Sequence, residues 1–145
     1  MNWARLASLK PREYLLLAEA STLVTIVNLA LRFLPYRFLE RMNRVKAAAT
    51  GSAIPASAAP GKIGWAVQAV SRRLPGRNAC LVQALAAQAM LRRRGFVSDL
   101  RIGVAGRDPD GAIKAHAWVE YQGNVIVGEI ADLSSYSVLA SPKTS

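Results

Sequence analysis

The chain has 145 residues, 52% of them hydrophobic and 19% charged, which is enough for one domain with a sizeable core. A single cysteine and a single histidine exclude a disulfide scaffold, a cysteine-rich zinc module and a histidine-cluster metal site, and we expect no cofactor. The formal net charge is +10, but residues 1–107 contain 17 basic and four acidic groups, whereas residues 108–145 contain two basic and five acidic groups. The basic part of the chain is suited to an anionic partner.

The first expected element is a long helix from Pro11 to about Leu34, since proline suits the first helical position and Pro35 ends the helix. Its apolar stretch exceeds the ~7–15 residues of a secretory signal core and no small-residue cleavage site follows it, so we expect a cytoplasmic protein. Polar residues recur every three or four positions and form one stripe, namely Glu19, Thr22, Thr25, Asn28 and Arg32. This stripe favours packing on protein, or lying against a membrane, over crossing a membrane.

A shorter helix is expected next, through Phe38, Leu39, Met42 and Val45. Residues 47–61 are rich in Ala, Ser, Gly and Pro and contain no charge, which is typical of a linker or exposed loop. These patterns divide the chain into a helical lead-in at residues 1–46, a linker at residues 47–61, and a core at residues 62–145.

The core is expected to begin with a helix that Pro75-Gly76 ends. A second helix is predicted over Ala79–Arg94, with Asn78 at its N-cap and Gly95 after its last turn. The hydrophobic period then changes to two, and strands are expected over residues 99–105, 113–121 and 125–130. Helices followed by an antiparallel meander predict an α+β fold in which at least one helix packs on a small sheet.

Cys80 and His116 are the candidate catalytic residues. Cys80 lies at the second position of its predicted helix, where backbone N–H groups and the helix dipole favour a thiolate. His116 lies on the second predicted strand. A lone cysteine is more often a buried, inert side chain. A thiolate and an imidazole together, however, are the minimum apparatus for covalent acyl transfer.

A third catalytic group would have to bind the distal nitrogen of the imidazole. Glu120 shares the face of His116 but lies roughly 13 Å away along the strand. A two-residue turn at Gln122-Gly123 would place Glu129 opposite His116, whereas a three-residue loop would move Glu129 to the other face. Glu129 is therefore the predicted third residue, with Asp132 as the alternative.

Three sequence blocks resemble the transglutaminase-like leader peptidases of lasso-peptide biosynthesis: CLVQALAAQAMLRRRG (residues 80–95), LRIGVA and AHAWVEYQGNVIVGE. The N-terminal segment REYLLLAEA…LALRFLPYRFLERM resembles the helical lead-in of that family, so the resemblance covers nearly the whole chain apart from the linker and the tail. It implies a papain/transglutaminase-like core and a Cys–His–acid peptidase that removes the leader of a ribosomally made precursor. Many relatives have an aspartate on the strand after the histidine. Here Val127-Gly128-Glu129 occupies that position, so Glu129 is a substitute.

The resemblance also implies three partners, namely the precursor peptide, a separate leader-recognition protein and an ATP-dependent macrolactam synthetase. We expect no fused recognition domain and no nucleic-acid partner, since no nucleic-acid-binding motif is present. Three other functions stay open at this stage: a cell-wall peptidase of the NlpC/P60 type, which would need an export signal, a thiol acyltransferase, and a basic adaptor. The runs Arg72-Arg73 and Arg92-Arg93-Arg94 fit either solvated helix ends or a surface for an acidic leader. Contact of the N-terminal helix with a membrane also stays open.

Overall fold

The computed structural model describes residues 10–33, 59–72, 74 and 78–139. Within these ranges the elements in chain order are α2 (Pro11–Phe33), α4 (Pro60–Ser71), α5 (Ala79–Arg93), β1 (Asp99–Arg107), β2 (Ile113–Tyr121), β3 (Asn124–Val127), the 3-10 turn η1 (Leu133–Ser135) and β4 (Ser137–Leu139). The α+β prediction is confirmed. The helix expected through residues 38–45 and most of the linker lie outside the described residues.

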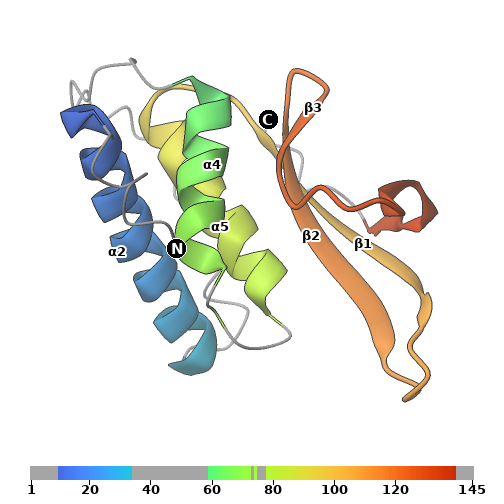
Figure 1. Cartoon of the computed structure of the whole chain (residues 1–145). Coiled ribbons are helices and arrows are strands. Elements are labelled where there is room, and N and C mark those ends of the chain that lie inside the picture. Colours follow the sequence, from blue (N-terminus) through green and yellow to red (C-terminus); the bar gives the residue numbers. More distant parts are fainter. Residues whose placement is uncertain (1–9, 34–58, 73, 75–77, 140–145) are drawn as a thin grey trace.

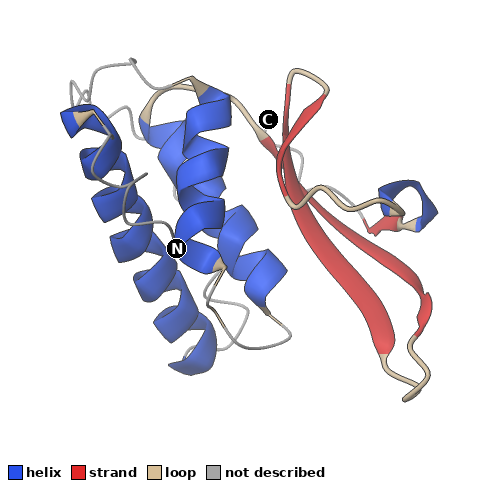
Figure 2. Cartoon of the chain, viewed as in Figure 1, coloured by secondary structure: helices blue, strands red, loops and turns tan. Residues whose placement is uncertain are grey.

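The helices form one layer and the antiparallel sheet a second (Figures 1 and 2). The strand order in the sheet is β3-β2-β1-β4, and α5 packs on β2, while α4 packs on β3. Helix α2 packs on α4 and α5 at the outer side of the helical layer, and η1 lies on the other side of the sheet (Figure 1). Among the described elements, none covers the outer face of α2, whereas the segment around η1 covers part of the sheet face opposite the helices.

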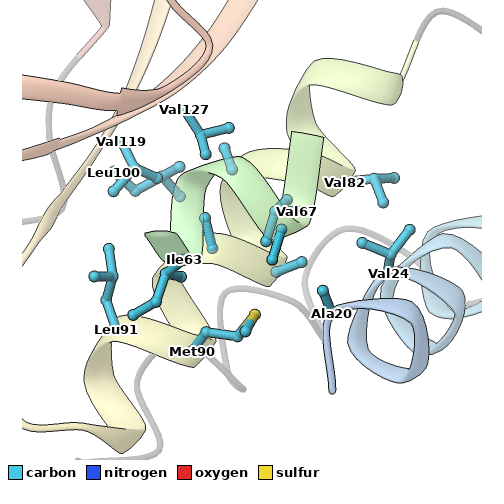
Figure 3. Close-up of a cluster of buried hydrophobic side chains, with 14 of the residues drawn as sticks. Ala20, Val24, Ile63, Val67, Val82, Met90, Leu91, Leu100, Val119 and Val127 are labelled. Carbon is cyan, nitrogen blue, oxygen red and sulfur yellow. The ribbon is translucent and has the colours of Figure 1, made fainter. Parts of the chain in front are cut away.

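One hydrophobic core joins the two layers (Figure 3). Helix α2 contributes Ala20 and Val24, and the sheet contributes Val119 and Val127, all of them at most 2% exposed. Helix α5 is buried on several sides, with three alanines at 0% exposure, because small side chains let neighbouring elements approach closely. The predicted lead-in helix thus shares its core with the segment that follows the linker.

The end of α5 matches the sequence pattern. Gly95 has a φ of 80°, its N–H bonds to the Arg92 carbonyl at 3.0 Å, and the N–H of Phe96 bonds to the Leu91 carbonyl at 3.0 Å. These two bonds define a Schellman motif, which satisfies the last carbonyls of the helix. At the other end, Asn78 precedes the helix as predicted, but its side chain makes no capping hydrogen bond.

Three ion pairs connect α2 to the other helices, and in the longest of them Nη1 of Arg93 lies 3.7 Å from the Glu19 carboxylate. The carboxylate of Glu19 accepts hydrogen bonds from both terminal nitrogens of Arg94, at 3.2 and 2.6 Å. The Arg94 side chain is only 4% exposed. Glu13 pairs with Lys62 at 3.3 Å near the other end of the interface. One arginine of the run at residues 92–94 therefore holds two helices together and is not available to an acidic leader.

The hairpin between β2 and β3 contains an irregularity that the sequence did not predict. Gln122 and Gly123 have φ angles of 49° and 79°, so the connection is a two-residue turn that pairs Tyr121 with Asn124. The register then shifts by one residue, and Val119 pairs with Val127. Such a shift is a β-bulge, and it reverses the face of every residue that follows on β3.

Strand β4 was not predicted. Its three residues pair antiparallel with β1, and the preceding segment, which includes η1, leads from the end of β3 to the opposite edge of the sheet. Ser137–Leu139 is too short to show a hydrophobic period. Its pairing with β1 places Tyr136 against β2 residues, as described next.

Candidate active site

Cys80 lies in the first turn of α5. Its side chain is half-buried and packs against the hydrophobic core, and it is a free thiol. The N–H of Val82 bonds to the Asn78 carbonyl at 3.0 Å, so the N–H groups of Cys80 and Leu81 precede the regular helical hydrogen bonds. Backbone donors at a helix start are suited to binding an oxyanion.

The imidazole of His116 is held in an aromatic cluster. Its ring centroid lies 6.2 Å from that of Trp118, with an angle of 17° between the planes, and 5.7 Å from that of Tyr136. Gly103 pairs with His116 across the sheet, and a Cβ at Gly103 would stand 3.0 Å from the Trp118 ring. The glycine therefore leaves the space that the indole occupies.

A backbone carbonyl fixes the orientation of the imidazole. Nε2 of His116 lies 2.7 Å from the carbonyl oxygen of Gly128. A carbonyl oxygen only accepts hydrogen bonds, so Nε2 carries the proton and donates. In the neutral ring, Nδ1 then carries the lone pair and is the nitrogen available to a reacting group.

Only a glycine fits at position 128. Its φ is 89°, and a Cβ there would stand 2.6 Å from the Ala117 carbonyl oxygen and 2.8 Å from the Cβ of Trp118. This tight approach brings the carbonyl to Nε2. The sequence analysis noted Gly128 only as a neighbour of Glu129. The signal that could have singled it out is an isolated glycine just after a short strand.

The expected register of Glu129 is wrong. The predicted two-residue turn is present, but the bulge after Val125 shifts the numbering by one, and β3 ends at Val127. Glu129 is exposed, and the distal nitrogen of His116 faces the Gly128 carbonyl instead of a carboxylate. The alternative, Asp132, is also exposed and lies at the N-cap of η1. The predicted role of Glu129 or Asp132 depended on a carboxylate bound to Nε2, and Nε2 is bound to the Gly128 carbonyl instead. A catalytic role for either residue stays a prediction.

Glu120 has a role that the sequence analysis missed. Its Oε1 accepts a hydrogen bond from the Trp118 indole Nε1 at 2.8 Å, and its Oε2 lies 3.4 Å from Nε of Arg101. Trp118 is 3% exposed and stacks on His116. Glu120 therefore orients the tryptophan that covers one side of the imidazole.

Cys80 and His116 lie in different layers of the molecule. Ala117 and Val119 belong to the core beneath the helices, so strand alternation turns His116 to the face where Tyr136 lies. Among the described residues, His116 is hydrogen-bonded to Gly128 and not to Cys80. Because β3 pairs with β2 no further than Val119, no described strand covers that edge of β2 at His116. The Cys80–His116 pair stays a prediction.

The comparison with protein families provides the decisive observation. The model of the transglutaminase-like superfamily matches residues 23–141, most of the chain. The chain belongs to the transglutaminase-like superfamily. Comparisons with curated proteins and with solved structures give no match.

Transglutaminase-like proteins are generally cysteine proteases or acyltransferases, so the family supports cysteine-dependent acyl chemistry. The matched region contains Cys80 on a helix and His116 on a strand, the order in which transglutaminase-like cores present their nucleophile and base. In the described part of the chain, no three His, Cys, Asp or Glu side chains gather into a set that could hold a metal ion.

Proposed function

We propose that this protein is a cysteine peptidase that removes the leader from a lasso-peptide precursor. The observation that carries the proposal is the position of Cys80 in the first turn of a long helix, within a region that matches the transglutaminase-like superfamily. The fixed orientation of His116 adds support, because a general base needs a defined tautomer. The leader specificity depends on the resemblance of residues 80–95 and of the AHAWVE block to the leader peptidases.

The reaction begins when the thiolate of Cys80 attacks the carbonyl carbon at the junction of leader and core. An S–C bond forms, and the backbone N–H groups at the start of α5 stabilise the oxyanion. The imidazolium of His116 donates the Nδ1 proton to the departing nitrogen, and the C–N bond breaks, which leaves the leader as a thioester. Water then attacks the thioester with His116 as base, and the products are a free leader carboxylate and the Cys80 thiol.

The proposal requires the sulfur and Nδ1 to come together. Because Gly128 already engages Nε2, Nδ1 is the nitrogen that serves the sulfur. We therefore propose that substrate binding draws the start of α5 and His116 together at the edge of β2 that β3 leaves uncovered. A peptide extended along this edge would lie between the two groups and could pair with the exposed strand.

Two partner proteins follow from this function, in addition to the precursor peptide. A separate recognition protein presents the leader, and an ATP-dependent macrolactam synthetase consumes the freed core peptide. Both steps belong in the cytoplasm, where the ribosome supplies the precursor and ATP is present. Arg93 pairs with Glu19 at 3.7 Å but its side chain is 53% exposed, so an acidic leader can still reach it, whereas the buried Arg94 side chain is committed to Glu19.

The test is a cleavage reaction with a lasso-peptide precursor and its leader-recognition protein, followed by mass spectrometry. We expect free leader and free core with the native chain, and neither product with Cys80→Ala. A short acid quench should trap the leader as a thioester on Cys80, the only cysteine of the chain. Leader release by a folded Cys80→Ala variant would refute the proposal.

The same experiment separates a peptidase from an acyltransferase. With a primary amine added in excess, a peptidase still forms mainly the free leader acid, whereas an acyltransferase forms the leader amide. Both outcomes require Cys80, so an amide product that depends on Cys80 would correct the reaction type and keep the nucleophile.

A further inference from the structure

The outer face of α2 is a continuous exposed surface. Exposed positions recur every three or four residues along the helix, so they lie on one side of it. Several of them are large and apolar, among them Leu15 (71% exposed), Ile26 (51%), Leu29 (49%) and Phe33 (77%). This set, together with Tyr14, Ala18, Ser21, Thr22 and Thr25, is here called the outer face of α2. A run of this length without a described covering element marks an interaction surface.

The hydroxyl groups on this face do not depend on water for their hydrogen bonds. The hydroxyl of Ser21 donates to the Leu17 carbonyl at 2.7 Å, and that of Thr22 donates to the Ala18 carbonyl at 2.9 Å. Thr25 donates in the same way to the Ser21 carbonyl at 2.7 Å. Each hydroxyl is therefore already hydrogen-bonded within the helix, which removes most of the penalty for placing it in apolar surroundings.

The charges of α2 are divided between its two sides. Its two carboxylates face the other helices, where Glu13 pairs with Lys62 and Glu19 pairs with Arg94. Arg12 and Arg32, near the two ends of the helix, are exposed, and among the described residues neither forms an ion pair. The exposed side therefore presents an apolar centre between two cations and no carboxylate.

We propose that the outer face of α2 binds the surface of a bilayer that contains anionic phospholipid, with the helix parallel to the membrane plane. Apolar side chains would enter the headgroup–acyl boundary, and Arg12 and Arg32 would contact lipid phosphates. The net positive charge of residues 1–107 adds long-range attraction to such a surface.

The structure favours this orientation over a membrane-spanning one. Within the described residues α2 is the one helix with the length and composition to cross a bilayer. Its inner side, however, contributes Leu16, Ala20 and Val24 to the common core and is held by three ion pairs. Crossing the membrane would break these contacts, expose the core residues that α2 covers and separate Arg94 from Glu19.

Electrostatics also favour lipid over a second copy of this chain. Two outer faces that pack antiparallel would place Arg12 of each copy beside Arg32 of the other, and two parallel faces would place identical arginines together. Either arrangement brings like charges together without a carboxylate. An anionic lipid surface neutralises both ends at once.

The test is flotation of the full chain with two kinds of vesicle, phosphatidylcholine alone and phosphatidylcholine with a quarter phosphatidylglycerol. We expect flotation only with the anionic vesicles, and a decrease in 1 M salt. Replacing Arg12 or Arg32 by glutamine should weaken binding about fivefold each. Leu29→Glu should abolish flotation, whereas Val97→Glu, at a residue that is 82% exposed on another surface, should float like the native chain.

Three results would overturn the proposal: no flotation with anionic vesicles, equal flotation of the Leu29→Glu and Val97→Glu variants, or a dimer in solution that Leu29→Glu dissociates. Thermal unfolding of each variant checks that the exposed substitutions leave the fold intact. The proposal does not depend on the proposed peptidase activity. Cys80→Ala should float like the native chain whatever its effect on cleavage.

Discussion

The carbonyl oxygen of Gly128 occupies the place beside His116 where a triad would have a carboxylate, 2.7 Å from Nε2. A carbonyl dipole orients an imidazole and fixes its tautomer without a negative charge. It also does not titrate, so it holds the ring in the same way over the whole range in which a carboxylate would gain or lose a proton. The third group of this candidate site is therefore a backbone carbonyl, which a β-bulge and a glycine bring to the imidazole.

Gly128→Ala should disrupt both the fold and the imidazole. The new Cβ would collide with the Ala117 carbonyl at a φ of 89°, and we expect a loss of about 2–5 kcal/mol in the free energy of unfolding. Gly111→Ala is the matched control, because Gly111 also has a positive φ (79°) but no atom within 4 Å of its Cβ position, so it should lose only about 1 kcal/mol. Denaturant unfolding measures both values. An equal loss for the two variants would show that the close packing at Gly128 is unimportant.

His116 can be followed directly, because it is the only histidine in the chain and gives a single set of imidazole NMR signals. We expect the Nε2–H tautomer in the native chain, read from the ¹⁵N shifts of the ring. His116→Gln should reduce leader release about 100-fold or more through the loss of acid–base catalysis. Glu129→Gln and Asp132→Asn should each change the rate little, because both residues are exposed and Nε2 is bound to the Gly128 carbonyl. A loss with Glu129→Gln as large as that with His116→Gln would restore Glu129 as the third catalytic residue.

Much of this fold was predictable from local patterns. The predicted bounds of β2 (Ile113–Tyr121) are those observed, and Gly95 ends α5 as its position indicated, because both depend on nearby residues. The register of Glu129 was not predictable, since a single extra residue in β3 reverses its face and no residue pattern announced it. Strand β4 was missed because three residues with no period pair with β1 only through tertiary contact.

The residues of the candidate site also fall into two groups, those that local sequence predicts and those that depend on tertiary contacts. The sequence identified Cys80 and His116 by their residue types and their places on a helix and a strand, which are local properties. Gly128, Tyr136 and the orientation of Trp118 by Glu120 depend on how the segment after β3 returns to the sheet. Only the folded chain brings these groups together, so composition and spacing could not indicate them.

The ion pairs of Glu19 and the ion pair of Glu13 should differ strongly in their contribution to stability. Glu19→Ala leaves the guanidinium of Arg94, at 4% side-chain exposure, without its carboxylate, and we expect a loss of about 3 kcal/mol or more. Glu13→Ala removes a pair whose lysine is 54% exposed and screened by water, so it should lose much less. Urea unfolding of the two variants provides the comparison. Similar losses would mean that water reaches Arg94 more freely than its burial indicates.

Glu13 should also make the free energy of unfolding slightly dependent on pH in the acid range. The Lys10 backbone N–H, which donates to the Glu13 carboxylate at 3.0 Å, is the main cause of the lowered pKa of Glu13; burial opposes it by a smaller amount, and Lys62 lowers the pKa further. Because the folded pKa is below the unfolded one, this stabilisation is complete above the unfolded pKa and disappears as the pH falls through the folded value. Relative to native protein, Glu13→Gln should therefore be less stable near neutral pH, with the difference vanishing in acid. A difference that is constant with pH would contradict this origin.

Two glycines of α4 provide the sharpest test of how closely the helices approach the sheet. A Cβ at Gly64 would overlap the carbonyl oxygen of Ile126, whereas a Cβ at Gly61 would have no atom within 4 Å. Gly61→Ala should raise the free energy of unfolding by about 0.5–1 kcal/mol, because alanine is the better helix former. Gly64→Ala should lower it by about 2 kcal/mol or more, because α4 must move away from β3 and its neighbours in the core lose contact. Opposite signs for the same substitution three residues apart on one helix would place α4 directly on β3. A stabilising Gly64→Ala would mean that the two elements are further apart than the structure shows.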